Sequence, residues 1–153
     1  MVNGPLIPAP GGGTDGGGLA AHGAMRVPLR IVDLGRRGRG VVAGRRIEAG
    51  ELVERSPVLI IPHEQRAAVD PTAVGNYIFL WEPGTVGEDL YRQEGRAAVA
   101  LGYTSLVNHS ATPNCAFTRH FDALVLDLNA LRAIEAGEEI TFDYGMTLWF
   151  EPE

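Results

Sequence analysis

Cysteine is almost absent from this 153-residue sequence, which contains Cys115 alone. A single cysteine cannot form an intramolecular disulfide, and it excludes a zinc site built from several cysteines. The four histidines stand at positions 22, 63, 109 and 120, without the short spacing that is typical of metal ligands. We therefore predict no metal site, and we expect a reducing, cytoplasmic setting.

Lysine is missing entirely, and all thirteen basic residues are arginine. Together with the many alanine and glycine residues, this bias favours a high-GC bacterial source. Long apolar runs are also lacking, since no segment approaches the roughly 18 residues that a membrane-spanning helix needs. The first residues contain no apolar segment of the kind found in secretory signals, so we expect neither a membrane anchor nor secretion.

Large apolar side chains are scarce near the N-terminus, where residues 1–25 hold 8 of the 20 glycines. Such a segment buries too little surface to offset the entropy of ordering, so we predict a disordered tail over 1–25. The remaining residues, 26–153, are enough for one domain with its own core.

Charge is divided unevenly along the chain. Residues 1–46 have a net charge of +5 and residues 47–153 a net charge of −11. An acidic body makes direct nucleic-acid binding unexpected and suits a basic partner, such as a protein tail rich in lysine and arginine. The simpler interpretation, that the acidic surface only maintains solubility, stays open.

Short apolar segments punctuated by glycine predict a mostly-β fold, with no helix of ten or more residues. A third strand is expected to be interrupted at Pro57, and residues 63–69 predict a short helix or turn. The predicted strands cover 29–34, 41–43, 51–54 with 58–61, 76–81, 116–118, 124–128 and 139–142.

The segment I-E-A-G-E occurs twice, at 47–51 and at 134–138. Each copy stands between two apolar segments, and its glycine suits a turn position with positive φ. Two copies are too few for a repeat architecture. They predict a pair of β-turns at corresponding places in the fold.

Gly38-Arg39-Gly40 begins a match to the glycine-rich dinucleotide fingerprint. That function requires a helix directly after the glycines, whereas here Val41 and Val42 lead into another turn. Two interpretations stay open, a simple β-turn and a loop whose bare backbone approaches a ligand.

Asn108-His109-Ser110 follows an apolar pair and is itself followed by Pro113-Asn114. The segment also fits a glycosylation sequon, which has no effect without secretion. If they are buried, these polar side chains need hydrogen-bond partners, so they either tie loops together or bind a ligand. Tyr144 stands at the end of the last predicted strand, where it is either a strand-end aromatic or a site residue.

These segments together resemble the two signature motifs of the SET domain, the fold of most protein-lysine methyltransferases. The resemblance extends from about residue 30 to residue 150. It implies a β-clip fold with a knot-like C-terminal crossing, and methyl transfer from S-adenosylmethionine to a lysine in a basic protein tail. Any such lysine must belong to another chain, because this one has none.

The resemblance also assigns roles to individual residues. It makes Tyr144 the catalytic residue. The implied cofactor-binding residues are Gly38, Arg39, Gly40, Asn108, His109, Tyr144 and Trp149. The implied lysine channel is formed by Tyr77, Tyr103, Phe142 and Phe150. An aromatic channel excludes water and favours the neutral amine, so neither a metal nor a strong base is required.

The likeness is strongest to small stand-alone SET proteins of bacteria and chlorella viruses, and the viral member also suggests a homodimer. The sequence departs from larger members in having S-L-V at 105–107, no channel tyrosine after the third strand, and no cysteine-rich tail. These departures leave open a degenerate SET module that binds a basic peptide without catalysis. A third alternative is an acidic interaction protein with chance motifs.

Overall fold

A computed structural model of the chain describes residues 27–82 and 95–144. The predicted tail 1–25 and the predicted site residues Trp149 and Phe150 lie outside the described residues. Within the described part, one α-helix, α1 (His63–Val69), and three 3-10 helices accompany nine strands. The 3-10 helices are η1 (Gly35–Arg37), η2 (Ala73–Tyr77) and η4 (Thr104–Leu106).

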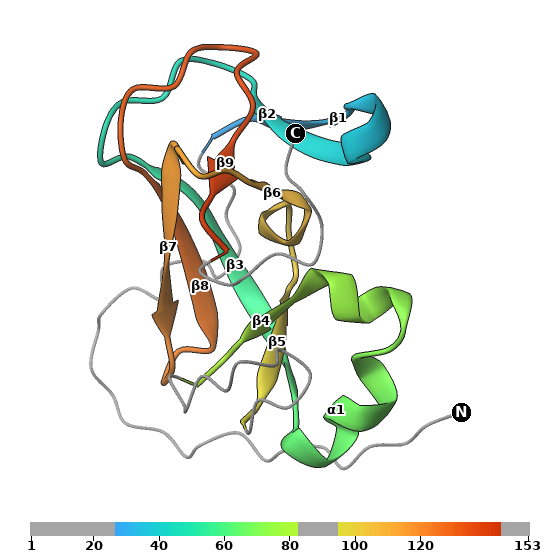
Figure 1. The fold of residues 1–153 in the computed structure, drawn as a ribbon. Helices are drawn as coiled ribbons and strands as arrows, with labels where there is room; N and C mark the ends of the chain where they lie inside the picture. The colour runs from blue at the N-terminus through green and yellow to red at the C-terminus, as the bar shows by residue number, and fades with distance from the viewer. Residues whose placement is uncertain (1–26, 83–94, 145–153) are drawn as a thin grey trace, which may run out of the picture.

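The strands confirm the predicted mostly-β class. They are β1 (Leu29–Asp33), β2 (Arg39–Ala43), β3 (Leu52–Ile61), β4 (Ile78–Leu80), β5 (Ala97–Ala100), β6 (Asn108–His109), β7 (Cys115–His120), β8 (Val125–Ala130) and β9 (Thr141–Phe142). Strands β1 and β2 form an antiparallel pair, and the other seven form one sheet in the order β4-β5-β3-β8-β7-β9-β6. Figure 1 shows the β1–β2 pair at the top of the molecule and α1 at the bottom.

The long strand β3 joins the two ends of the large sheet, and it is continuous through Pro57. Residues 52–57 pair with β8, whereas residues 58–61 pair with β5. Pro57 therefore stands where the strand changes partner. Its carbonyl accepts a hydrogen bond from the Leu101 N–H at 2.8 Å, and the next N–H, of Val58, donates to Leu124 at 3.0 Å. The predicted interruption at Pro57 is wrong, because the missing N–H of proline falls at this change of partner.

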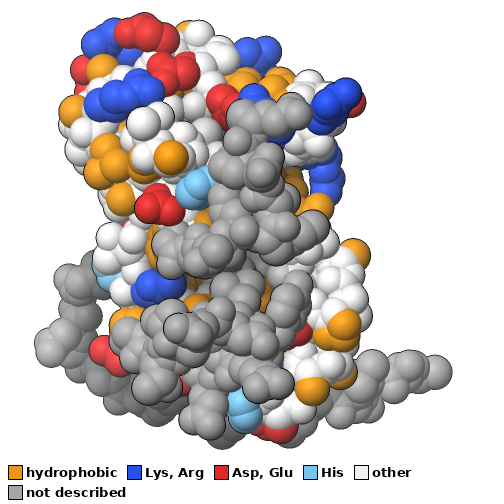
Figure 2. Space-filling model, in the orientation of Figure 1, with side chains coloured by type: hydrophobic (Ala, Val, Ile, Leu, Met, Phe, Trp, Pro, Cys, Tyr) orange, Lys and Arg blue, Asp and Glu red, His pale blue; other side chains and the backbone are white. Residues whose placement is uncertain are grey.

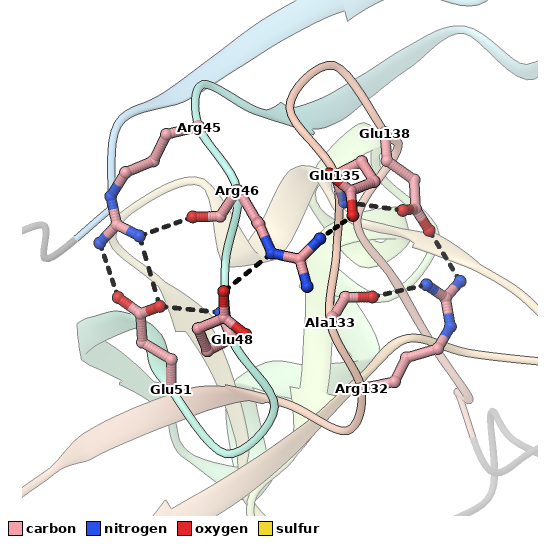
Figure 3. Close-up of polar contacts among 8 residues, drawn as sticks. All are labelled: Arg45, Arg46, Glu48, Glu51, Arg132, Ala133, Glu135 and Glu138. Atoms are coloured by element: carbon pink, nitrogen blue, oxygen red, sulfur yellow. Dashed lines mark hydrogen bonds and ion pairs between the residues drawn. The ribbon is translucent and has the colours of Figure 1, made fainter.

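The two I-E-A-G-E segments lie side by side as a matched pair of turns (Figure 3). Ile47 and Ile134 form an antiparallel bridge, with backbone N···O distances of 2.9 and 3.0 Å. Gly50 and Gly137 have φ values of 80° and 84°, which only glycine adopts without strain. The sequence echo therefore corresponds to two copies of one local structure, each completed by the other.

Charged side chains brace both turns in the same way. Arg45 binds the carboxylate of Glu51, and Arg132 binds the carboxylate of Glu138, while each arginine also donates to the carbonyl of its following residue (Figure 3). The symmetry ends at Arg46, which binds Glu48 and Glu135 of the two turns. The paired turns lie at the upper left of Figures 1 and 2, and acidic and basic side chains are intermixed there in Figure 2.

The core lies where the β1–β2 pair, the two turns and the large sheet meet. Both bridge residues, Ile47 and Ile134, are fully buried there, together with Ile140. Cys115 belongs to the same cluster, and burial raises the pKa of its thiol to about 12. A thiol in this state is a small apolar core group and not a nucleophile. None of the helices within residues 27–82 and 95–144 is long and apolar enough to cross a membrane.

Arg55 and Asp127 form a cross-strand ion pair between β3 and β8. Two hydrogen bonds of 2.6 Å join the guanidinium to the carboxylate, and His120 Nε2 lies 3.0 Å from the same carboxylate. The Arg55 hydrogen bonds, with a smaller contribution from His120, hold the pKa of Asp127 below its ordinary value. A lowered pKa in the folded state stabilises the protein above the unfolded pKa, and this contribution is lost as pH falls through the folded value.

We therefore expect Asp127→Asn to destabilise the protein by about 1–2 kcal/mol at neutral pH. The difference from the parent should shrink below about pH 4, where the Asp127 carboxylate of the unfolded parent begins to take up a proton while that of the folded parent is still charged. Chemical unfolding of both proteins at neutral pH and at about pH 3 measures this effect. Asp122→Asn, in the exposed hairpin turn, is the control. A difference that stays constant across the pH range would contradict the prediction.

Candidate functional site

The two motif segments meet as parallel strands. Strand β6 lies beside β9, with Asn108 opposite Thr141 and His109 opposite Phe142, and the Ser110 N–H continues the pairing with a 3.2 Å bond to the Phe142 carbonyl. Figure 1 shows these strands beneath the β1–β2 pair. Segments more than thirty residues apart in sequence therefore form one surface. The predicted knot-like threading depends on residues beyond 144 and stays a prediction.

Asn108 connects this surface to the glycine loop. Its side-chain Nδ2 donates to the backbone carbonyl of Arg39 at 3.4 Å and to Glu139 Oε1 at 2.9 Å. The predicted cofactor residue thus touches the loop predicted to bind the same cofactor. No helix follows this loop, since β2 begins at Arg39, which agrees with rejecting the dinucleotide fingerprint.

The two glycines of the loop serve different needs. Gly38 has φ +72°, and its N–H and carbonyl are used within the loop, in bonds of 3.0 Å to the Gly35 carbonyl and 2.7 Å from the Leu34 N–H. A Cβ atom there would meet nothing within 4 Å, so the space beside Gly38 is open. Gly40 faces inward, where a Cβ atom would lie 2.4 Å from Leu34 Cδ1 and 3.0 Å from Asn108 Nδ2. Gly40 therefore permits the close contact between the loop and Asn108.

Tyr144 is held at both its backbone and its hydroxyl. Its N–H donates to His109 Nδ1 at 3.2 Å, and its hydroxyl donates to the Val107 carbonyl at 3.0 Å. Because Nδ1 of His109 accepts a hydrogen bond, a neutral ring carries its proton on Nε2. The ring of Tyr144 packs 5.1 Å from that of Phe142 and 5.3 Å from that of His109. These contacts fix the aromatic ring beside the strand that carries Asn108.

Burial raises the pKa of the Tyr144 hydroxyl above its ordinary value of about 10, and the nearby Glu139 carboxylate acts in the same direction. The phenol is therefore protonated at neutral pH. It can donate a hydrogen bond through its proton and accept one through its oxygen, but it cannot act as a phenolate base.

The predicted channel residues occupy two kinds of environment. Tyr77 is partly exposed, and its hydroxyl accepts a 3.5 Å hydrogen bond from Arg39 Nη2, next to the glycine loop. Tyr103 is partly buried against the core. Phe142 is 3% exposed and packs against Phe79 and Phe117 at centroid distances of 5.8 and 5.2 Å. Phe142 thus supports the ring of Tyr144 from within the core and is not open to a substrate in this structure.

Glu54 is a buried carboxylate that the sequence interpretation overlooked. It accepts hydrogen bonds from the Tyr103 N–H at 2.9 Å, the Thr104 N–H at 2.7 Å and the Thr104 hydroxyl at 2.5 Å. Glu54 is 5% exposed, so these three donors satisfy a group that would otherwise be costly to bury. It anchors the start of η4, the turn that leads directly into Asn108.

Glu139 was also overlooked, although the sequence contained a signal for it. In the paired turns, the residue that follows the last glutamate is Leu52 in the first copy and Glu139 in the second. The equivalent position is apolar in the first copy and acidic in the second, which indicates that Glu139 has a function beyond forming the turn. The carboxylate of Glu139 contacts Arg37 at 2.8 Å as well as Asn108.

Metal ligands do not assemble near these residues. Among the residues that the structure describes, no group of three or more histidine, cysteine, aspartate or glutamate side chains could hold a metal ion.

Comparison with known proteins gives matches over most of the chain. The family model described as SET domain matches residues 38–145. A Schizosaccharomyces pombe protein named histone-lysine N-methyltransferase, H3 lysine-37 specific, is 34% identical over 130 residues, covering 84% of this chain and 81% of that protein. Human histone-lysine N-methyltransferase 2B is 34% identical over 114 residues, which cover 70% of this chain but only 4% of the human protein.

A solved structure gives a match of the same kind. The Neurospora SET domain protein DIM-5, a histone lysine methyltransferase, superposes with a TM-score of 0.58 at 27% identity. The match covers 84% of this chain and 56% of the Neurospora chain.

Proposed function

This chain belongs to the SET-domain family, and we propose that it is a protein-lysine N-methyltransferase that uses S-adenosylmethionine. One observation carries the proposal. The glycine loop, the segment around Asn108 and Tyr144 come from three separate parts of the sequence. Asn108 contacts the loop at Arg39, and Tyr144 binds Val107 and His109 on either side of Asn108. The names of the relatives support the reaction, and the contacts support these residues as its site.

The residues present fit the methionine end of the cofactor. The open space beside Gly38 lets a ligand approach the loop, and the Asn108 side-chain amide contacts Arg39 of the same loop. An amide oxygen suits an ammonium group. Bound S-adenosylmethionine would supply a methyl group on a positively charged sulfur.

The chemistry at lysine requires a neutral amine. An ordinary lysine has a pKa of about 10.4, so removing its proton at neutral pH costs roughly 4–5 kcal/mol. Aromatic walls that exclude water disfavour the ammonium form and lower this cost. Tyr144 keeps its own proton, so we assign it to orienting the amine through its hydroxyl oxygen and not to removing the amine proton. The main contribution of the protein to the reaction rate is then to align the lysine nitrogen with the methyl group and the sulfur of the cofactor.

We propose a basic, lysine-containing protein tail as the substrate. The formal net charge of −6 favours a basic partner. A surface hollow beside the site has an apolar floor that includes Phe117 and Leu131, with Asp143 among its lining residues. An apolar surface next to a carboxylate suits the long stem and charged end of lysine or arginine.

Several finer features belong to the same proposal. The motif residues favour a likeness to the small stand-alone SET proteins of bacteria and chlorella viruses. The arginine-only composition supports a bacterial source. We also propose a cytoplasmic location, no direct nucleic-acid binding, and a homodimer by resemblance to the viral member.

Two measurements test the proposed function. Calorimetry with S-adenosylmethionine should give a dissociation constant between about 1 μM and 1 mM, the usual range for enzyme substrates. Methyl-labelled cofactor should then transfer label to a lysine-rich peptide and not to the same peptide with arginine at every lysine. The chain contains no lysine, so label on lysine cannot come from self-modification. Peptide binding without cofactor binding would replace the enzyme with the non-catalytic module.

A further inference from the structure

We propose that Glu139, paired with Arg37, is a positioning residue that fixes the orientation of the Asn108 amide, so that the Asn108 oxygen faces the cofactor's methionine ammonium group. This inference rests on the proposed function, since it concerns the same cofactor. It adds a residue to which neither the sequence interpretation nor the family resemblance assigned a role.

Glu139 uses its two carboxylate oxygens on different partners. Oε1 accepts a hydrogen bond from Asn108 Nδ2 at 2.9 Å, and Oε2 lies 2.8 Å from Arg37 Nη1. The Glu139 side chain is 18% exposed, whereas that of Arg37 is 43% exposed. A carboxylate held from both sides in this way has little freedom to turn away from Asn108.

Two neighbouring acceptor oxygens determine the orientation of the Asn108 amide, that is, which of Nδ2 and Oδ1 faces them. Nδ2 faces two oxygens, Glu139 Oε1 and the Arg39 carbonyl. Turning the amide over would place its own oxygen against both of them, and none of the three could donate a proton. The Asn108 Oδ1 is therefore directed away from Glu139 and Arg39, and within residues 27–82 and 95–144 no protein donor contacts it.

The backbone of Glu139 is fixed independently of its side chain. Asn114 Nδ2 donates to the Glu139 carbonyl at 2.8 Å, and Asn114 Oδ1 accepts from the Thr141 N–H at 2.9 Å. A bridge to Val42 holds the other edge of the same segment. The carboxylate therefore projects toward Asn108 from a segment that is held on both sides, by Asn114 and by Val42.

An amide oxygen and an amide nitrogen make opposite demands on a ligand. An ammonium group only donates hydrogen bonds, so it binds the oxygen and is repelled by the NH₂ end. The arrangement is thus specific for the charged amine of the methionine end and has no bearing on an adenosine group.

The test compares two ligands that differ in that end. S-adenosylhomocysteine carries the amino-acid group, whereas 5′-methylthioadenosine lacks it. We expect Glu139→Gln to weaken binding of S-adenosylhomocysteine about tenfold, the effect of one hydrogen bond to a charged group. Binding of 5′-methylthioadenosine should stay within about twofold. Glu135→Gln, which removes the same charge from an exposed turn position, should leave both affinities unchanged.

A second comparison shows whether Glu139 acts through Asn108. In an Asn108→Ala background, Glu139→Gln should have no further effect on S-adenosylhomocysteine binding. Equal weakening of both ligands, an undiminished effect in that background, or unchanged binding by Glu139→Gln would each overturn the inference while leaving the proposed function in place. Failure of the parent protein to bind either ligand would instead overturn the proposed function, and the inference with it.

Discussion

Replacing Tyr144 with phenylalanine is expected to lower methyl transfer by about a hundredfold or more, while cofactor affinity changes by less than about twofold. The substitution removes only the hydroxyl, which donates to the Val107 carbonyl. The ring keeps its packing against Phe142 and His109, so the cofactor surface stays in place. Labelled transfer to a lysine-rich peptide measures the rate, and calorimetry with S-adenosylhomocysteine measures the affinity.

Tyr103→Phe is the comparison for this prediction. Tyr103 is held through its backbone N–H, which Glu54 binds, and its ring is partly buried against the core. Removing its hydroxyl should lower the rate by no more than about tenfold, as expected for a residue that only shapes a channel. Full activity of Tyr144→Phe would remove Tyr144 from the reaction. A parallel loss of cofactor affinity would assign the hydroxyl of Tyr144 to cofactor binding and not to the transfer step.

Replacing Asn114 with alanine is expected to lower the free energy of unfolding by about 2–4 kcal/mol, because several buried groups lose their partners. Asn114 is 2% exposed, and its amide binds the Glu139 carbonyl, the Glu138 carboxylate and the Thr141 N–H. These bonds attach the motif segment to the segment that ends in Tyr144. Urea unfolding followed by circular dichroism measures the loss.

Two further variants show whether the hydrogen bonds or the side-chain volume cause that loss. Asn114→Asp keeps the volume and the oxygen that accepts from Thr141, but it places a second oxygen toward Glu138, 3.2 Å from the present nitrogen. We expect it to destabilise the protein at neutral pH at least as much as Asn114→Ala. Asn76→Ala, at an exposed position, should change stability by less than about 0.5 kcal/mol. A stable Asn114→Asp variant would refute the assignment of these bonds.

The motif residues were predictable because their pattern is local. Apolar residues before Asn108 and before Tyr144 indicate strand ends, and the repeated I-E-A-G-E segment indicates two equivalent turns. The structure confirms the mostly-β class and the paired turns. Pro57 was misjudged because the effect of a missing N–H depends on which neighbour the strand pairs with at that residue. A strand's change of partner leaves no trace in its own sequence.

By itself, the sequence determined the class of the fold, the family, and the three segments that the site is built from. Composition, turn residues and motif spacing are properties of the chain in order, and they require no knowledge of contacts. Only the tertiary structure decided how the segments that carry Asn108 and Tyr144 work together. It placed Phe142 in the core, Arg39 beside Tyr77, and Glu139 between Arg37 and Asn108. The direction of an amide depends on which oxygens surround it, and these come from segments that meet only when the chain folds.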